Sequence, residues 1–312
     1  MGFPLYCNTG VCIRARPEFG VVLCSERKEP GAMRRRVLRK VDNELAKGNT
    51  KTALSLVKQL QGKPGGLRGF GGAKQVPLRR YSLDELNLSE TEISSLRPVM
   101  KSILKSIDIS LRLSALPSES LEGLAEEGTK LDTVDAVPCE EYHRMCTQHE
   151  AGHFLTAYLL GVLPKGYTIP SLEAMKNDEL VGGRVDFIGF EFLSSVRTLT
   201  SLKEKSNVGK ASPRNLNRFS CVAIGGLTAE CLTFGYSEGS FNDIEQMETL
   251  LKTLGFKKSE AILQINWSVL NTLLMLSRHY NAMLKLAASM SAGKSIGFCI
   301  DTIESSLNGN ET

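Results

Sequence analysis

Apolar residues recur at helical spacing soon after the start of the chain. Between residues 33 and 61 an apolar side chain returns every three or four positions, as on one face of an α-helix. These residues are Val37, Val41, Leu45, Leu54, Val57 and Leu60. The sequence GNT at 48–50 interrupts the spacing, and the glycines of 62–66 end it. The pattern predicts a helical hairpin over residues 33–61.

The next segment, 62–138, shows weaker periodicity. Its first part, GKPGGLRGFGGAK (62–74), is rich in glycine and predicts a linker. Residues 82–136 predict short helices separated by breaks rich in Ser and Glu. From Cys139 to residue 307 apolar positions are denser and mostly helical in spacing, so we expect a mainly α main domain there. The alternating stretch VGGRVDFIGFEF (181–192) is the exception and predicts a small strand or hairpin insertion.

Composition and charge narrow the function classes. The chain has 312 residues, of which 42% are hydrophobic and 23% charged, as in an ordinary globular protein. Its first 80 residues carry 17 Lys and Arg against 5 Asp and Glu, so a basic head precedes an acidic body. Residues 1–32 lack periodicity and predict a disordered or transit-like segment. The chain shows neither finger spacing nor basic strands with interleaved aromatics, so we expect no nucleic-acid partner.

The most apolar run, FLTAYLLGVL at 154–163, is too short to cross a bilayer, which needs roughly 20 residues. We therefore expect no transmembrane segment.

The same region holds the main candidate for chemistry. In HEAGH (149–153), His149 and His153 are four residues apart, so a helix presents both imidazoles on one face. Two such imidazoles supply half of a tetrahedral zinc shell. Glu150 follows His149 directly and is placed to accept a proton from water that the metal activates. Gly152 weakens a helix by about 1 kcal/mol relative to alanine, which indicates that another backbone passes close by.

The residues alone leave the remaining ligand open. Cys146, three residues before His149, offers a Cys–His pair, but no second pair lies nearby to complete a structural site. We therefore expect a carboxylate from further along the chain. Two satisfied histidines in a buried helix, with no metal, are the simple alternative.

A second stretch carries a resemblance to a known family. HEAGH, followed by IGGLTAECLTFGYSEGSFNDIEQ (224–246), resembles the peptidase domain of the FtsH-type zinc metalloproteases over residues 140–306. The resemblance implies that Asp243 is the third zinc ligand and that Glu230 lies close to the metal shell. GYT at 166–168 is similar to a turn that follows the zinc helix in that family. We expect Glu230 to orient a histidine ligand, and Gly225 and Gly226 to let its helix approach Gly152.

Some residues depart from the family pattern. An arginine of the family is Leu227 here, and a second glutamate is Cys231. The upstream part of the chain is too short for an AAA ATPase module. ASMSAGKS (288–295) fits a loose phosphate-loop pattern, but it follows a helical stretch, and Gly293 is better explained as a helix end. The chain is closest to the short, ATPase-less FtsH-like proteins of plants, which implies a chloroplast location.

Two functions follow as hypotheses. The first is a zinc-dependent metalloendopeptidase that cleaves peptides or unfolded proteins with Glu150 as general base, alone or with an AAA ATPase or FtsH-type partner. The second is a catalytically idle scaffold or assembly factor that keeps zinc for stability.

Overall fold

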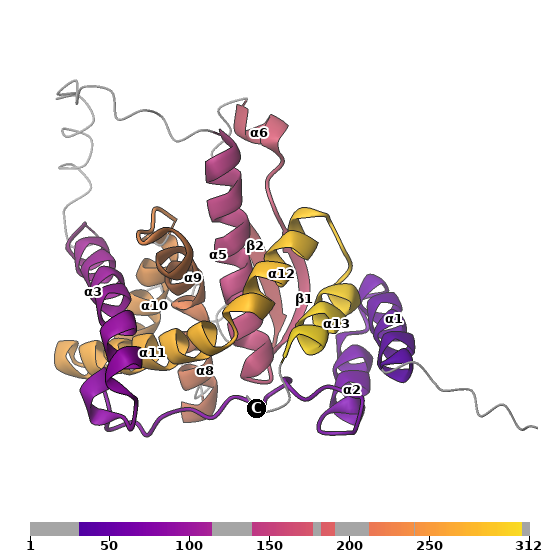
Figure 1. Cartoon of the computed structure of the whole chain (residues 1–312), viewed down its shortest axis with the longest axis horizontal. Helices are drawn as coiled ribbons and strands as arrows, with labels where there is room; N and C mark the ends of the chain where they lie inside the picture. Colours follow the sequence, from indigo (N-terminus) through magenta and orange to yellow (C-terminus); the bar gives the residue numbers. More distant parts are fainter. Residues whose placement is uncertain (1–30, 114–138, 177–181, 191–211, 240, 308–312) are drawn as a thin grey trace, which may run out of the picture. The chain divides into compact units, whose positions relative to one another are not determined.

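The computed structural model describes residues 31–113, 139–176, 182–190, 212–239 and 241–307 (Figure 1). The prediction of a mainly α-helical chain is confirmed. The N-terminal elements are α1 (Ala32–Ala46), α2 (Thr50–Leu60), a 3₁₀ turn η1 (Leu83–Glu85) and α3 (Glu90–Leu113). The predicted segment 1–32 lies almost wholly outside the described residues.

The remaining elements begin at Cys139. They are α5 (Cys139–Leu159), β1 (Leu163–Thr168), α6 (Leu172–Lys176), β2 (Arg184–Ile188), α8 (Pro213–Ala223), α9 (Gly225–Phe234), α10 (Phe241–Thr253), α11 (Lys258–Arg278), α12 (Tyr280–Ser291) and α13 (Ile296–Ser306). Within the described ranges, no helix combines the length and the apolar character that a membrane crossing requires.

Helix α5 is the centre of the packing. Every residue from Thr147 to Leu160 is buried, including polar ones, so the helix has no solvent-facing side over this stretch. It contacts α8, α9, α11, α12 and both strands, and Figure 1 shows α12 crossing it. A helix that is buried all round needs partners on every face. The C-terminal helices supply most of them.

The two strands form a small antiparallel sheet. β1 pairs with β2, with Leu163 opposite Ile188 and Thr168 opposite Arg184, and an irregularity falls between Pro164 and Gly166. The expected strand within 181–192 is therefore confirmed as β2. The implied turn at 166–168 is wrong, because these residues form the second half of β1. Pairing with β2 keeps them extended.

The glycine-rich segment is part of the core. Leu67 and Phe70 are buried at 0% and 2% exposure. The backbone N–H groups of Gly71 and Ala73 donate to the carbonyls of Tyr158 and Leu159, in the last turn of α5. The last carbonyls of a helix have no partner within the helix. Residues 71–73 satisfy two of them, so this segment caps α5 instead of acting as a free linker.

Helix α3 also differs from expectation. It runs for 24 residues through Pro98, where a set of short helices had been predicted within 82–136. Met100, Ile103 and Ile107 lie at helical spacing and are buried, and α3 packs against α9, α10 and α11. This apolar stripe outweighs the Ser- and Glu-rich breaks. Residues 114–138 lie outside the described part.

The sequence SAGKS forms the corner between α12 and α13. Gly293 has a φ of 64°, and Lys294 N–H donates to the Ser289 carbonyl, which is the hydrogen-bond pattern of a helix end. The N-terminus of α13 is filled by Asp42, which accepts hydrogen bonds from Gly297 N–H (2.6 Å) and the Ser295 hydroxyl (2.7 Å). A carboxylate of α1 thus occupies the position that a bound phosphate would take.

Glu304 provides a test of how α13 holds the segment that caps α5. This carboxylate is 2% exposed. It accepts hydrogen bonds from the backbone N–H groups of Arg68 (2.9 Å) and Gly69 (2.7 Å) and from the Tyr158 hydroxyl (2.7 Å). Glu304→Ala leaves three donors without an acceptor, two of them on the buried residues Gly69 and Tyr158, so we expect the free energy of unfolding to fall by about 3 kcal/mol in urea titrations. The exposed Glu245→Ala is the control and should change it by less than about 0.5 kcal/mol. Equal effects of the two variants would contradict this role.

Candidate metal centre

Two helices bring three ligand atoms together. His149 and His153 lie on α5, with their Nε2 atoms 2.9 Å apart. Asp243 lies in the first turn of α10, and its Oδ2 is 3.0 Å from His149 Nε2 and 3.1 Å from His153 Nε2. Ligand atoms in a tetrahedral zinc shell are roughly 3.3 Å apart, given Zn–N distances of about 2.0 Å. The spacing of these three atoms suits a single metal ion.

The hydrogen bonds of the outer ring nitrogens fix which atoms face the centre. His153 Nδ1 lies 2.7 Å from the carbonyl oxygen of Val222, which can only accept, so Nδ1 carries the proton. His149 Nδ1 lies 2.5 Å from Glu230 Oε1 and donates to that carboxylate. Both Nε2 atoms of the neutral rings therefore present lone pairs toward Asp243. Three electron-pair donors with no hydrogen among them require a cation, either a proton or a metal ion.

Glu230 is hydrogen-bonded to Nδ1 of His149, the ring nitrogen that does not face Asp243. It lies on α9 and is 1% exposed. Its Oε2 accepts from the backbone N–H of Glu238 at 2.8 Å, in the chain that folds back after α9. Gly235, with a φ of 85°, ends α9 and permits this reversal. Burial alone would raise the pKa of Glu230, but the hydrogen bonds to its carboxylate and the charge of His149 together outweigh burial and lower the pKa. Glu230 is therefore an anion that orients the imidazole.

Glycines allow α5 and α9 to cross with their backbones in contact. A Cβ atom at Gly152 would lie 2.3 Å from the carbonyl oxygen of Gly225. A Cβ atom at Gly226 would lie 2.3 Å from His149 Nε2. The expectation that another backbone passes close to Gly152 is confirmed. The same crossing leaves room for the His149 ring.

The ionisable groups of the centre shift one another's pKa values. Burial lowers the pKa of His149, but the carboxylates of Asp243 and Glu230 outweigh it and raise the pKa well above the ordinary value. The pKa of His153 is also raised, because Asp243 favours the protonated ring and opposes the effect of burial. Burial would raise the pKa of Asp243, yet the two histidines hold it far below its usual range. Without a metal, protons on the imidazoles supply the missing cation.

Glu150 faces the same space from α5. It is 5% exposed, and burial raises the pKa of its carboxyl group above the usual value although His153 and His149 oppose the shift. A carboxylate with a raised pKa is a better proton acceptor near neutral pH. The arrangement thus combines three metal-ligand atoms with one adjacent base.

The centre opens into a cleft of about 840 Å³. One wall is formed by β2, whose residues Val185 to Phe187 line the cleft, and another by Phe219 and Val222 of α8. Within the described ranges, β2 pairs with β1. The cleft has room for several residues of a peptide.

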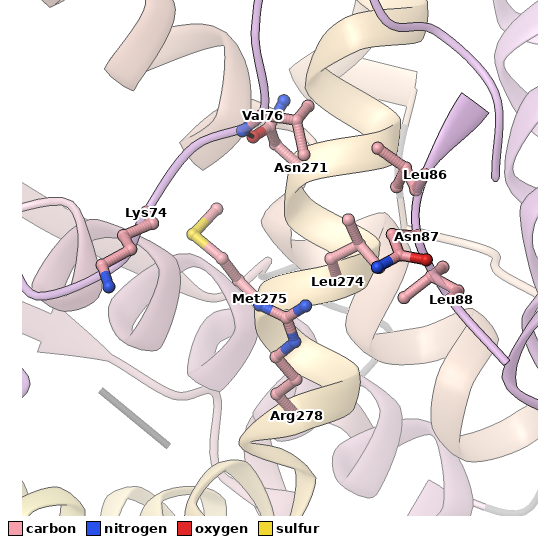
Figure 2. A pocket seen from close by; sticks show the side chains of 9 residues that line it. All are labelled: Lys74, Val76, Leu86, Asn87, Leu88, Asn271, Leu274, Met275 and Arg278. Carbon is pink, nitrogen blue, oxygen red and sulfur yellow. Dashed lines mark hydrogen bonds between the residues drawn. The ribbon is translucent and has the colours of Figure 1, made fainter. Parts of the chain in front are cut away.

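A second pocket, of about 170 Å³, lies between residues 74–88 and α11 (Figure 2). Its lining is aliphatic, with Lys74, Arg278 and the amides of Asn87 and Asn271. The Asn271 amide oxygen already accepts from the Val76 N–H at 2.8 Å. No histidine, carboxylate or thiol contributes to the lining that the structure describes, and we assign it no chemistry.

The structure brings together all five residues singled out in the sequence: His149, Glu150, His153, Glu230 and Asp243. The metal-ligand group that it forms from described residues contains His149, His153 and Asp243 and excludes Cys146. Sequence reasoning missed the Val222 carbonyl and the backbone at Glu238. Main-chain groups of this kind leave no signature in the residue type.

No family model matches the chain, and neither curated proteins nor solved structures gave a match. The assignment of function therefore rests on the residues and geometry described above.

Gly152→Ala tests the helix crossing. Alanine normally stabilises a helix relative to glycine by about 1 kcal/mol, but here its methyl group would meet the Gly225 carbonyl. We expect the variant to lose about 2 kcal/mol or more in the free energy of unfolding. The reverse change Ala288→Gly, at an exposed position of α12, should lose about 1 kcal/mol and calibrates the ordinary effect. A stabilised Gly152→Ala would refute the backbone contact.

The affinity of the centre for Zn²⁺ should depend on pH. Metal binding must displace protons from His149 and His153, and both pKa values are raised above the ordinary histidine value. Lower pH therefore favours protons over metal, and Zn²⁺ affinity should rise by about tenfold or more from pH 6 to pH 8. Competition with a fluorescent chelator measures this. His149→Ala should abolish binding and His143→Ala should preserve the pH dependence. Affinity that stays constant across this range would contradict the assignment.

Proposed function

We propose that this protein is a zinc-dependent metalloendopeptidase that cleaves peptides or unfolded proteins. The observation that carries the proposal is the group of three lone-pair donors with Glu150 beside it, at the base of a cleft that residues of β2 line. His149, His153 and Asp243 would hold the zinc. When bound, zinc polarises the scissile carbonyl and increases the acidity of water.

The protein's own residues supply the remaining steps. Glu150 accepts the proton of the attacking water and then donates it to the amine that leaves. Glu230 keeps the His149 ring in one tautomer and orientation through Nδ1. The outer edge of β2 aligns an extended substrate by main-chain hydrogen bonds. These roles agree with the resemblance of HEAGH and residues 224–246 to the FtsH-type peptidases.

The substrate range follows from the proposed site. An extended chain is required to pair with β2, so a folded protein must be opened before it is cut. In the phosphate-loop-like sequence 288–295, the position that a phosphate would take is occupied by the Asp42 carboxylate. This sequence therefore offers no ATP site. We propose that an AAA ATPase or FtsH-type partner supplies unfolding where it is needed. The excess of Lys and Arg in residues 1–80, together with the resemblance, supports a chloroplast location.

A second candidate function is a scaffold in which zinc serves stability alone. The observation in its favour is that the three ligand atoms come from α5 and α10, so a metal ion there would cross-link these two helices, while Glu230 of α9 holds His149 in place. Leu227 and Cys231 stand where the family has an arginine and a glutamate. Both are buried, so these positions contribute to core packing here. This alternative predicts stoichiometric zinc without turnover.

Glu150→Gln separates the two functions. The amide keeps the size of the side chain but cannot take up a proton, so we expect kcat on an unfolded casein-type substrate to fall by about 1000-fold. Zinc content, measured by atomic absorption, should remain at that of the wild type. Glu245→Gln, on the exposed side of α10, is the control.

Two results would count against the peptidase. One is a Glu150→Gln variant whose kcat equals that of the wild type. The other is a zinc-loaded wild type that cleaves no unfolded substrate but unfolds when zinc is chelated, which is the result expected of the scaffold.

A further inference from the structure

Gly183 lies directly before β2 and against the Glu150 side chain. A Cβ atom built on Gly183 would be 2.5 Å from Glu150 Cγ, 2.7 Å from Oε1 and 2.9 Å from Cδ. A Cβ atom essentially never comes within 3.0 Å of a heavy atom outside its own residue and its chain neighbours. A residue with any side chain at position 183 is therefore incompatible with the observed position of the Glu150 carboxylate.

The backbone conformation does not itself require glycine at this position. The glycines of the described ranges that have positive φ include Gly161, Gly189 and Gly235, and Gly183 is not one of them. The three nearest atoms that a Cβ would meet all belong to Glu150. The requirement for glycine thus comes from the glutamate.

The surroundings determine which group would move if position 183 carried a methyl group. Arg184 is fixed opposite Thr168 in the sheet register, and α5 is buried along its length at this point. The nearest contact is Glu150 Cγ, so the contact is relieved by rotation about the Cα–Cβ bond of Glu150, which moves the whole carboxylate. A methyl group at 183 would push the carboxylate away and leave the fold and the metal ligands in place.

We propose that Gly183 is a positioning residue for Glu150. By lacking a side chain, it leaves the space in which the carboxylate stays beside the metal-ligand group, and its backbone limits movement toward β2. The inference rests on the proposed peptidase function, because it assigns Gly183 to the placement of the general base. It adds a residue from the strand side of the cleft to the metal-ligand residues and the base, which lie on helices.

The neighbouring glycine provides a matched control. A Cβ atom at Gly182 would have nothing within 4 Å, and Gly182 likewise lacks a positive φ. Gly182→Ala and Gly183→Ala make the same chemical change one position apart. Any effect of a stiffer backbone appears in both variants, and the effect on Glu150 appears in only one.

The experiment compares both variants with the wild type as full-length, zinc-loaded protein. For Gly183→Ala we expect kcat on an unfolded casein-type substrate to fall by about 100-fold, with KM changed by less than about threefold and zinc content unchanged. A crystal structure of this variant should show the Glu150 carboxylate displaced from its wild-type position. Gly182→Ala should keep kcat within about twofold.

A double-mutant comparison covers the case in which Gly183→Ala is unstable. Glu150→Ala removes the atoms that the new methyl group would meet. Any loss in thermal midpoint caused by Gly183→Ala should therefore disappear in the Glu150→Ala background. A loss that persists there would overturn the proposal.

The remaining outcomes are distinct. An unmoved Glu150 carboxylate or wild-type kcat in Gly183→Ala would overturn the role of Gly183. A zinc-loaded wild type without turnover would overturn the peptidase instead. In that case the crystal structure and the double-mutant comparison still decide whether Gly183 sets the position of Glu150.

Discussion

The close contact between the backbones of Gly152 and Gly225 is the constraint on which the centre depends. Side chains at these positions would separate α5 from α9 and move Glu230 away from His149, since a Cβ on Gly152 would lie 2.3 Å from the Gly225 carbonyl. The same crossing brings the end of α8 close enough for the Val222 carbonyl to reach His153. Helices usually pack 8–10 Å apart, at a distance that side chains set. Here two glycines remove that limit, and the polar groups of three helices meet in the interior.

The interior carries an unusual amount of negative charge for its size. Glu230 and Asp243 are held as anions, and Glu150 lies beside them with a raised pKa. A cluster of carboxylates is stable in a protein interior only when positive charge accompanies it. Protonated histidines provide it in the absence of metal, and a divalent ion provides more of it at a single point. Protonation and metal binding are therefore competing solutions to one electrostatic requirement.

The sequence predicted much of this site because its main features are carried by residue type and spacing. The four-residue spacing of His149 and His153 and the glycine at 152 are visible without a structure. Asp243 could be placed only through the resemblance, since nothing local to GSFNDIEQ indicates which carboxylate returns to α5. Residues 71–73 were predicted as part of a linker and residues 166–168 as a turn. Both predictions were wrong because each conformation depends on a partner distant in sequence, the end of α5 in the first case and β2 in the second. Gly183 acts by lacking a side chain, which a pattern of side chains cannot show.

The bonds of Glu304 also bear on the order in which the chain can fold during synthesis. The carboxylate joins α13 to the backbone of Arg68, 236 positions earlier, and to Tyr158 at the end of α5. Contacts between such distant positions form late, because the whole intervening chain must be present. Until α13 has left the ribosome, residues 67–73 lack their anchor and α5 lacks part of its cover. The helix that bears both histidines is thus fully enclosed only after α13 has been made and has docked.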